Sequence, residues 1–112
     1  GNVTTPSSYI VNSPALNSSV PRSSQLQIRW SNPSNARVLI ILQSQSGDKF
    51  YLAQDQPDNG QHIIGSEKLS GFPAGNAILY VIKYTYNSAT ASDGKVYVMM
   101  AEIVKTSTII LN

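Results

Sequence analysis

Three stretches of this chain are apolar on consecutive residues, and each is too short to form an ordinary helix. They cover residues 38–42, 77–82 and 96–101, and turn-forming residues bound each of them. A strand turns successive side chains to opposite faces, so an unbroken apolar run predicts a strand that is buried on both faces. If the three strands share one sheet, the outer surface of that sheet is also covered.

The composition indicates one small domain with a real core. The chain has 112 residues, of which 41% are hydrophobic and only 12% are charged, about half the usual charged share. Eight Lys and Arg residues face six acids, and no two of the basic residues are adjacent. Nucleic-acid binding requires basic side chains concentrated in a patch or stripe, so we expect no nucleic-acid partner.

The chain contains no cysteine, which excludes disulfides, thiolate catalysis and cysteine-ligated metals. No apolar run reaches the roughly 18 residues that a membrane-spanning helix needs. The chain begins with Gly rather than Met, so we expect a processed N-terminus from which a targeting segment has been removed. Residues 1–8 are predicted to form a flexible polar tether, and residues 9–112 a single sandwich domain.

Alternating patterns and turn signals predict an all-β fold with almost no helix. Seven or eight strands are expected, at residues 8–11, 25–30, 36–42, 49–54, 61–64, 76–86, 95–104 and 106–111. Turns at this spacing are typical of an antiparallel β-sandwich. The stretch from 95 to 111 is too long for one regular strand, so we expect a bulge or a break near Lys105, Thr106 and Ser107.

The order of several short motifs resembles an immunoglobulin-like module of bacterial and fungal cell-surface proteins. The motifs are Ser13-Pro14, Leu26-x-Ile28-x-Trp30-Ser31, Asp58-x-Gly60-x-His62-x-Ile64 and Leu69-x-x-Phe72-Pro73-x-Gly75. The resemblance covers residues 10–111, and its bacterial members are often parts of envelope lipoproteins, notably in Bacteroidetes. It implies an immunoglobulin-like sandwich in the periplasm or outside the cell, with a membrane link only through a removed lipid anchor. It assigns no catalytic residue.

In such a sandwich the third, sixth and seventh strands lie together in one sheet, and these are the three apolar runs. The inner face of that sheet would fill the core. Its outer face would present an apolar patch large enough to bind a partner, a neighbouring domain or a second copy. The alternative is that bulges turn some of these residues inward, or that the N-terminal segment or a loop covers them.

Isolated ionisable residues offer no convincing site for chemistry. His62 is the only histidine and has no recognisable nucleophile or orienting acid, so we expect a structural or exposed role. The acids Asp55, Asp58 and Glu67 lack the spacing of a calcium loop, and turn formation accounts for Asp58. We therefore expect no metal, no cofactor and no enzymatic activity.

A carboxylate pair for glycoside hydrolysis would need two of the remaining acids to face each other across a cleft. Asp48 and Asp93 each fit a turn beside Gly, which already explains their positions. Glu102 stands in an otherwise apolar strand, where we expect it to mark the end of the covered region or to pair across the sheet with Lys83.

Tyrosines suggest a second kind of site. Tyr80, Tyr84 and Tyr86 fall on one face of the strand at 76–86, with Lys83 on the other face, and Tyr97 lies on the strand expected to pair with it. Such a ladder can stack on sugar rings, although packing of Tyr80 in the core is the alternative. Trp30 is predicted to lie in the core.

Two functions follow as hypotheses. The first is a non-catalytic interaction module that binds through the outer face of one sheet, and the second is a carbohydrate-binding module; a proteinase inhibitor using the loop at 31–35 is a more distant third. The residues expected at the interface or ligand site are Leu79, Val81, Lys83, Tyr84, Tyr86 and Tyr97.

Overall fold

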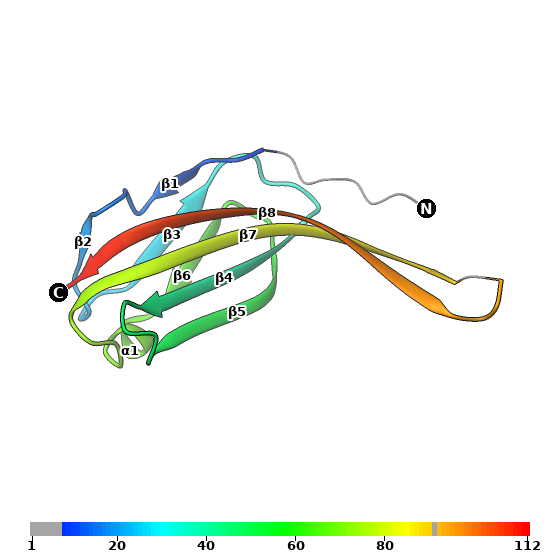
Figure 1. Ribbon diagram of the computed structural model, residues 1–112. Coiled ribbons are helices and arrows are strands. Elements are labelled where there is room, and N and C mark those ends of the chain that lie inside the picture. Colours follow the sequence, from blue (N-terminus) through cyan, green and yellow to red (C-terminus); the bar gives the residue numbers. More distant parts are fainter. Residues whose placement is uncertain (1–7, 91) are drawn as a thin grey trace.

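The computed structural model describes residues 8–90 and 92–112, and at 87–89 and 96–100 it describes the backbone alone. Within that part of the chain, strands follow one another with a single helical turn between them (Figure 1). Their bounds are β1 (Val11–Ser13), β2 (Ser19–Val20), β3 (Leu26–Trp30), β4 (Arg37–Ser44), β5 (Phe50–Pro57), β6 (Gln61–Ile64), α1 (Ser66–Leu69), β7 (Gly75–Thr90) and β8 (Val96–Leu111). Of the expected tether at residues 1–8, all but Ser8 lies outside the described residues.

The strands form two sheets that face each other. One sheet has the order β1-β3-β6, and the other has the order β2-β8-β7-β4-β5. The predicted two-sheet β fold is therefore confirmed. The prediction that all strands are antiparallel is wrong, because the short strand β2 runs parallel to the end of β8, with Val20 opposite Leu111. β2 has only two residues, too few to show the alternating pattern by which a strand is predicted from sequence.

The three strands that contain the apolar runs lie side by side in one sheet, as predicted. Only the runs at 38–42 and 77–82 lie beside each other, because the run at 96–101 is paired with residues 85–90. β7 is paired with β8 on one side and with β4 on the other. Because β7 is the central strand of these three, both of its edges are hydrogen-bonded along the body of the sandwich.

The core lies between the two sheets and takes alternate residues from each strand. In β3, Leu26, Ile28 and Trp30 are buried, which confirms the prediction for Trp30. In β4, burial alternates residue by residue, so Val38, Ile40 and Leu42 are fully buried. The period of two is the geometric signature of a strand with one face in a core.

Two local predictions are wrong. β8 pairs with β7 in continuous register from Val96 to Leu111, so there is no bulge near Lys105, Thr106 and Ser107. An equally long partner strand supplies hydrogen bonds along the whole length, which removes the need for a break. Helix α1 was also not expected, because four residues are too few to show a helical period. Within the described residues, no helix is both long and apolar enough to cross a membrane.

The hairpin of β7 and β8 is longer than the body of the sandwich. β4 pairs with β7 only as far as Tyr84, whereas β8 continues alongside β7 to Thr90. Figure 1 shows the end of this hairpin projecting past the other strands. We call residues 86–90 of β7 and 96–100 of β8, with the turn at 92–95, the arm.

Candidate functional site

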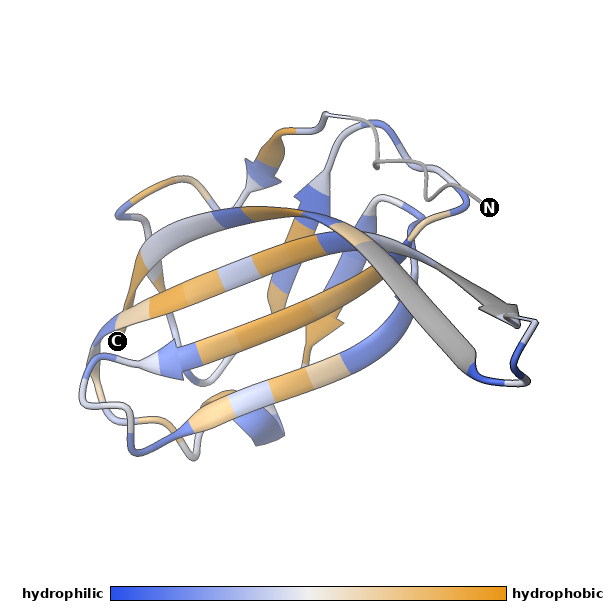
Figure 2. Ribbon diagram, turned by 45° about the vertical axis from the view of Figure 1, so that its right-hand side comes forward, coloured by the Kyte–Doolittle hydropathy of each residue, from blue (hydrophilic) through white to orange (hydrophobic). Residues whose placement is uncertain are grey.

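The five-stranded sheet has an apolar side that faces away from the core. Along β4 and β7, the residues between the buried ones are only partly buried and turn outward. We define the outer face by the apolar side chains on this side of the sheet: Leu39, Ile41, Leu52, Ile78, Tyr80, Ile82 and Val104. Figure 2 shows the hydrophobic stretches of β4 and β7 beside each other in the middle of this sheet.

The register makes these side chains direct neighbours across the strands. Leu39 on β4 lies opposite Ile82 on β7, which in turn lies opposite Val104 on β8. One row along, Ile41 lies between Leu52 on β5 and Tyr80 on β7. Directly opposite residues in a sheet have Cβ atoms about 5 Å apart, so the outer face is one continuous apolar surface.

A shallow hollow lies at the end of the outer face nearest the arm. Its volume is about 260 Å³, and its lining is Leu39, Gln54, Asp55, Ile82, Tyr84 and Glu102. Two of these lining residues are aliphatic, Leu39 and Ile82, and two carry carboxylates, Asp55 and Glu102. Val104 and Leu52 on the same face remain 46% and 44% exposed, so the described part of this chain does not cover the outer face.

The residues that the sequence assigned to the interface divide between the two faces of β7. Leu79 and Val81 are each 1% exposed and Lys83 is fully buried, so the expectation that these three lie at the surface is wrong. Ile78, Tyr80 and Ile82 face outward instead. The apolar run at 77–82 contains no charged residue, so its sequence does not show which side chains face outward.

Lys83 is buried because it has an ionic partner in the core. Its Nζ atom lies 2.9 Å from Oδ2 of Asp58, and both side chains are fully buried. It also donates hydrogen bonds to the backbone carbonyls of Asn32, at 2.6 Å, and Ser31, at 3.3 Å. The expected cross-strand pair of Lys83 with Glu102 does not form, since Glu102 lies opposite Tyr84 and is exposed.

The carboxylate of Asp58 accepts further hydrogen bonds that stabilise its ionised form. Trp30 Nε1 donates to Oδ1 at 2.6 Å, and the Ser34 hydroxyl donates to Oδ2 at 2.7 Å. Burial alone would raise the pKa of Asp58, but the hydrogen bonds from Trp30, Ser34 and Lys83 outweigh it and lower the pKa below its usual value. Turn formation, the role predicted for Asp58, is therefore only part of its role, because its carboxylate is also the buried partner of Lys83, Trp30 and Ser34.

Tyr9 covers this ion pair from the N-terminal side. Its ring centroid lies 4.7 Å from Nζ of Lys83, and its hydroxyl donates to the carbonyls of Val81, at 2.6 Å, and Ile103, at 2.8 Å. Burial raises the pKa of Tyr9 to about 12, which keeps this hydroxyl protonated as a donor. Tyr9 thus ties the N-terminal segment to β7 and β8 just before the arm begins, a role that nothing in its sequence context indicates.

Charged and aromatic side chains meet at the base of the arm. Arg37 Nε lies 2.8 Å from Oδ1 of Asp55, and the Tyr84 hydroxyl donates to the same oxygen at 3.1 Å. The hydrogen bond from Arg37, with the one from Tyr84, lowers the pKa of Asp55. The rings of Tyr84 and Tyr86 stack at 6.4 Å beside a hollow of about 390 Å³ that Asn35 and Arg37 also line.

Three tyrosines of the predicted ladder lie on one face of β7. Tyr84 and Tyr86 come together as expected, and Tyr80 lies on the same face two residues further along the outward row. Tyr80 is partly buried among outer-face residues rather than packed in the core. The side chain of Tyr97 lies outside the described residues.

His62 lies on the three-stranded sheet and contacts Tyr51. Its Nε2 atom is 2.9 Å from the Tyr51 hydroxyl, and burial lowers its pKa. Among the described residues, no carboxylate bonds to this half-buried imidazole to orient it as a general base. This arrangement agrees with a structural role for His62.

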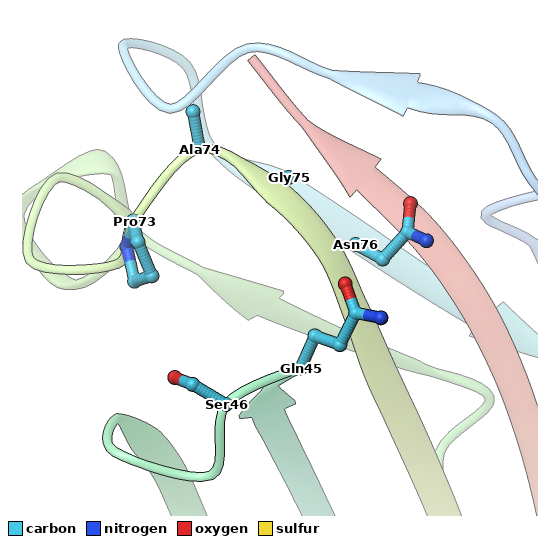
Figure 3. Close-up of a pocket in the computed structure, with 6 residues that line it drawn as sticks. All are labelled: Gln45, Ser46, Pro73, Ala74, Gly75 and Asn76. Atoms are coloured by element: carbon cyan, nitrogen blue, oxygen red, sulfur yellow. The ribbon is translucent and has the colours of Figure 1, made fainter.

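A further hollow, of about 400 Å³, lies at the opposite end of the sheet from the arm. Gln45 and Ser46, in the turn after β4, line one side, and the segment 73–76 lines the other (Figure 3). It offers amide and hydroxyl groups but no titratable side chain, so it has no group that would transfer a proton. Among the described residues, no three His, Asp or Glu side chains are grouped closely enough to hold a metal ion.

Comparison of the chain with protein-family models, with curated proteins and with solved structures finds no match.

Proposed function

We propose that this chain is a non-catalytic interaction module that binds a partner protein through the outer face. The observation that supports this proposal is the continuous apolar surface across β5, β4, β7 and β8, centred on Ile41, Ile82 and Tyr80. Soluble monomers rarely leave a contiguous apolar patch of more than a few hundred Å² in water. A partner with an apolar surface of similar width would remove these side chains from solvent.

The charges around the outer face favour a partner of particular chemistry. Glu102 is exposed beside Ile82 and Val104 and has no ion-pair partner within the described residues. Asp55 already pairs with Arg37 on the same rim. We therefore infer a partner surface that is apolar at its centre and carries a basic side chain opposite Glu102, since complementary charge at a rim guides association.

The setting of this module follows from the sequence resemblance. We propose an immunoglobulin-like sandwich of the cell envelope, located in the periplasm or outside the cell and linked to a membrane through a lipid anchor. The two-sheet fold is consistent with such a module. Charge-poor strands and the lack of cysteine agree with that location but do not identify it.

Site-specific photo-crosslinking in the source cells tests the proposed function. A benzophenone amino acid replaces Ile82 on the outer face, and in a matched control it replaces Gln61, an exposed residue of β6 on the other sheet. We expect one discrete covalent adduct with a different protein at position 82 and none at position 61. An adduct with a second copy of the chain, the same pattern at both positions, or no adduct at position 82 would contradict a specific protein partner.

Carbohydrate binding is the second candidate, and one observation favours it. The stacked rings of Tyr84 and Tyr86 border the hollow that Asn35 and Arg37 line, and Tyr86 is 59% exposed. An aromatic face with amide and guanidinium donors nearby is suited to a sugar ring. Affinity electrophoresis through gels with defined polysaccharides would show retardation, and Tyr86→Ala would abolish it; no retardation in any gel would exclude this candidate.

A further inference from the structure

The arm has a free backbone edge beyond the point where β4 begins. β4 pairs with β7 from Ala77 to Tyr84 and supplies no partner beyond that residue. Within the described residues, no other strand occupies this side of β7 between Tyr86 and Thr90. A two-stranded hairpin with no further strand is marginally stable in water, so the arm has reason to gain another strand.

The arm differs from the other edge of the same sheet in how it is protected. Edge strands avoid pairing with other chains through bulges, charges and proline. β5, the outer edge of the body, has all three: Lys49 before it, a bulge near Asp55 where φ is +53°, and Pro57 at its end. Residues 86–90 read Tyr-Asn-Ser-Ala-Thr, contain neither charge nor proline, and keep continuous register with β8.

The β8 side of the arm is a poorer place for another strand. At the base of the arm the Tyr9 hydroxyl already donates to the carbonyl of Ile103. A strand added along β8 would meet the N-terminal segment there. In the part of the chain that the structure describes, no strand pairs with the β7 side of the arm before β4 begins at Arg37.

We propose that the arms of two copies of this chain pair through β7, antiparallel and around a two-fold axis at Ser88. Tyr86 of one copy then lies opposite Thr90 of the other, which uses the whole free edge. Two-fold pairing of this kind requires only one type of surface. The arms of the two copies would form a sheet in the order β8-β7-β7-β8, and this order continues the order β8-β7-β4-β5 of each body.

The charges at the tip and base of the arm match in this arrangement. In this arrangement β7 of the second copy runs in the same direction as β4 of the first copy. The tip of the second arm therefore lies next to Arg37 of the first copy, where β4 begins. β8 of the second copy begins at that same tip, which lies beside the end of β5 of the first copy, near Asp55. Asp93, which follows β7, therefore approaches Arg37, and Lys95, which precedes β8, approaches Asp55.

The structure has room for this contact. The hollow of about 390 Å³ at the base of the arm is lined by Asn35, Ala36, Arg37, Tyr84, Thr85 and Tyr86, and the tip turn of the second copy would enter it. The tip turn is compact, since the backbone N–H of Lys95 donates to Asp93 Oδ1 at 3.0 Å. This pairing uses a backbone edge rather than the outer face, so it does not depend on the proposed function.

The lack of native cysteine allows a direct test on the full chain. Ser88→Cys places one thiol at the two-fold axis, and opposite residues of antiparallel strands have Cα atoms about 4.5–5.5 Å apart, within the range of a disulfide. Ser92→Cys is the control, because the two positions 92 would be separated by about eight residues of strand, or roughly 27 Å. Under mild oxidation we expect a disulfide-linked dimer from Ser88→Cys and monomer from Ser92→Cys, each with native circular dichroism.

A second variant tests the same pairing without a new thiol. The unmodified chain should show by sedimentation equilibrium a mass of twice 12.1 kDa as its concentration rises. Exchanging the tip charges, Asp93→Lys with Lys95→Asp, should weaken this association about tenfold because like charges then meet at the base. A monomeric Ser88→Cys, equal crosslinking of Ser92→Cys, or association that the charge exchange leaves unchanged would overturn the proposal.

Discussion

The two faces of β7 are almost equally apolar in sequence, yet the molecule uses them in different ways. On the inner face, Ala77, Leu79, Val81 and Lys83 are at most 1% exposed. On the outer face, Ile78, Tyr80 and Ile82 are only partly buried, and the described chain places no second layer over them. The one charged residue in this stretch lies on the buried side. Hydrophobic composition alone therefore does not show which face of a central strand the fold itself requires.

The largest expected effect comes from breaking the buried ion pair on the inner face. Lys83→Met leaves the Asp58 carboxylate in the core without its cation, and such a loss costs about 3–5 kcal/mol. Urea unfolding followed by tryptophan fluorescence measures it, since Trp30 is the only tryptophan. Lys49→Met, at an exposed position, is the matched control and should leave the midpoint unchanged. Equal midpoints for the two variants would show that the pair does not stabilise the fold.

Truncation of adjacent residues on opposite faces sharpens the comparison. Leu79→Ala removes a fully buried side chain from the core and should cost about 2–5 kcal/mol. Ile78→Ala, one residue earlier and on the outer face, should cost about 1 kcal/mol or less, because that side chain is already partly in water. Urea midpoints at constant slope measure both losses. Similar losses would mean that both faces belong to the core of the isolated chain.

The stability of the inner face should depend on pH in acid. The pKa of Asp58 is lower in the folded chain than in the unfolded chain, where a carboxyl of this type titrates near about 3.9. Between these two pKa values the unfolded chain binds a proton that the folded chain does not, so stability falls as the pH drops through this window. Above about pH 5 the contribution is complete.

Urea midpoints measured from pH 6 to pH 2.5 test this dependence. Asp58→Asn should give a flatter profile than the unmodified chain across the acid range. Asp55→Asn is the control, because Asp55 is exposed and water screens its interaction with Arg37. A profile flattened more by Asp55→Asn than by Asp58→Asn would contradict the role given to the buried pair.

The smallest effect on stability is expected at the base of the arm. Tyr84→Phe removes the hydroxyl that donates to Asp55 but keeps the ring that stacks on Tyr86. Because these groups are largely exposed, the urea midpoint should stay within experimental error. The acid titration of Asp55, followed by NMR, should move upward instead, since one hydrogen bond that lowers its pKa is lost. An unchanged pKa would show that the hydroxyl does not contact Asp55 in solution.

The sequence predicted the two-sheet fold because period-two patterns and turn residues depend on local geometry. The placement of the three apolar runs in one sheet also followed from strand order. The features that the sequence did not predict, such as the burial of Lys83, depend on contacts between residues far apart in the chain. The burial of Lys83 requires Asp58, which lies 25 positions earlier, and no local pattern links the two residues. The predicted interface therefore mixed the two faces of β7: Leu79 and Val81 are buried, whereas Tyr84 and Tyr86 lie on the outward side with Ile78, Tyr80 and Ile82.

The central claim is that the outer face serves binding and is not needed for the fold. The double variant Ile41→Thr, Ile82→Thr tests it directly, because threonine keeps the β-branched shape while making the surface polar. We expect its free energy of unfolding to lie within about 2 kcal/mol of the original, whereas Ile40→Thr alone, on the inner face, should cost more because it buries an unpaired hydroxyl. A double variant less stable than Ile40→Thr would show that the fold itself requires the outer face, and would contradict the account.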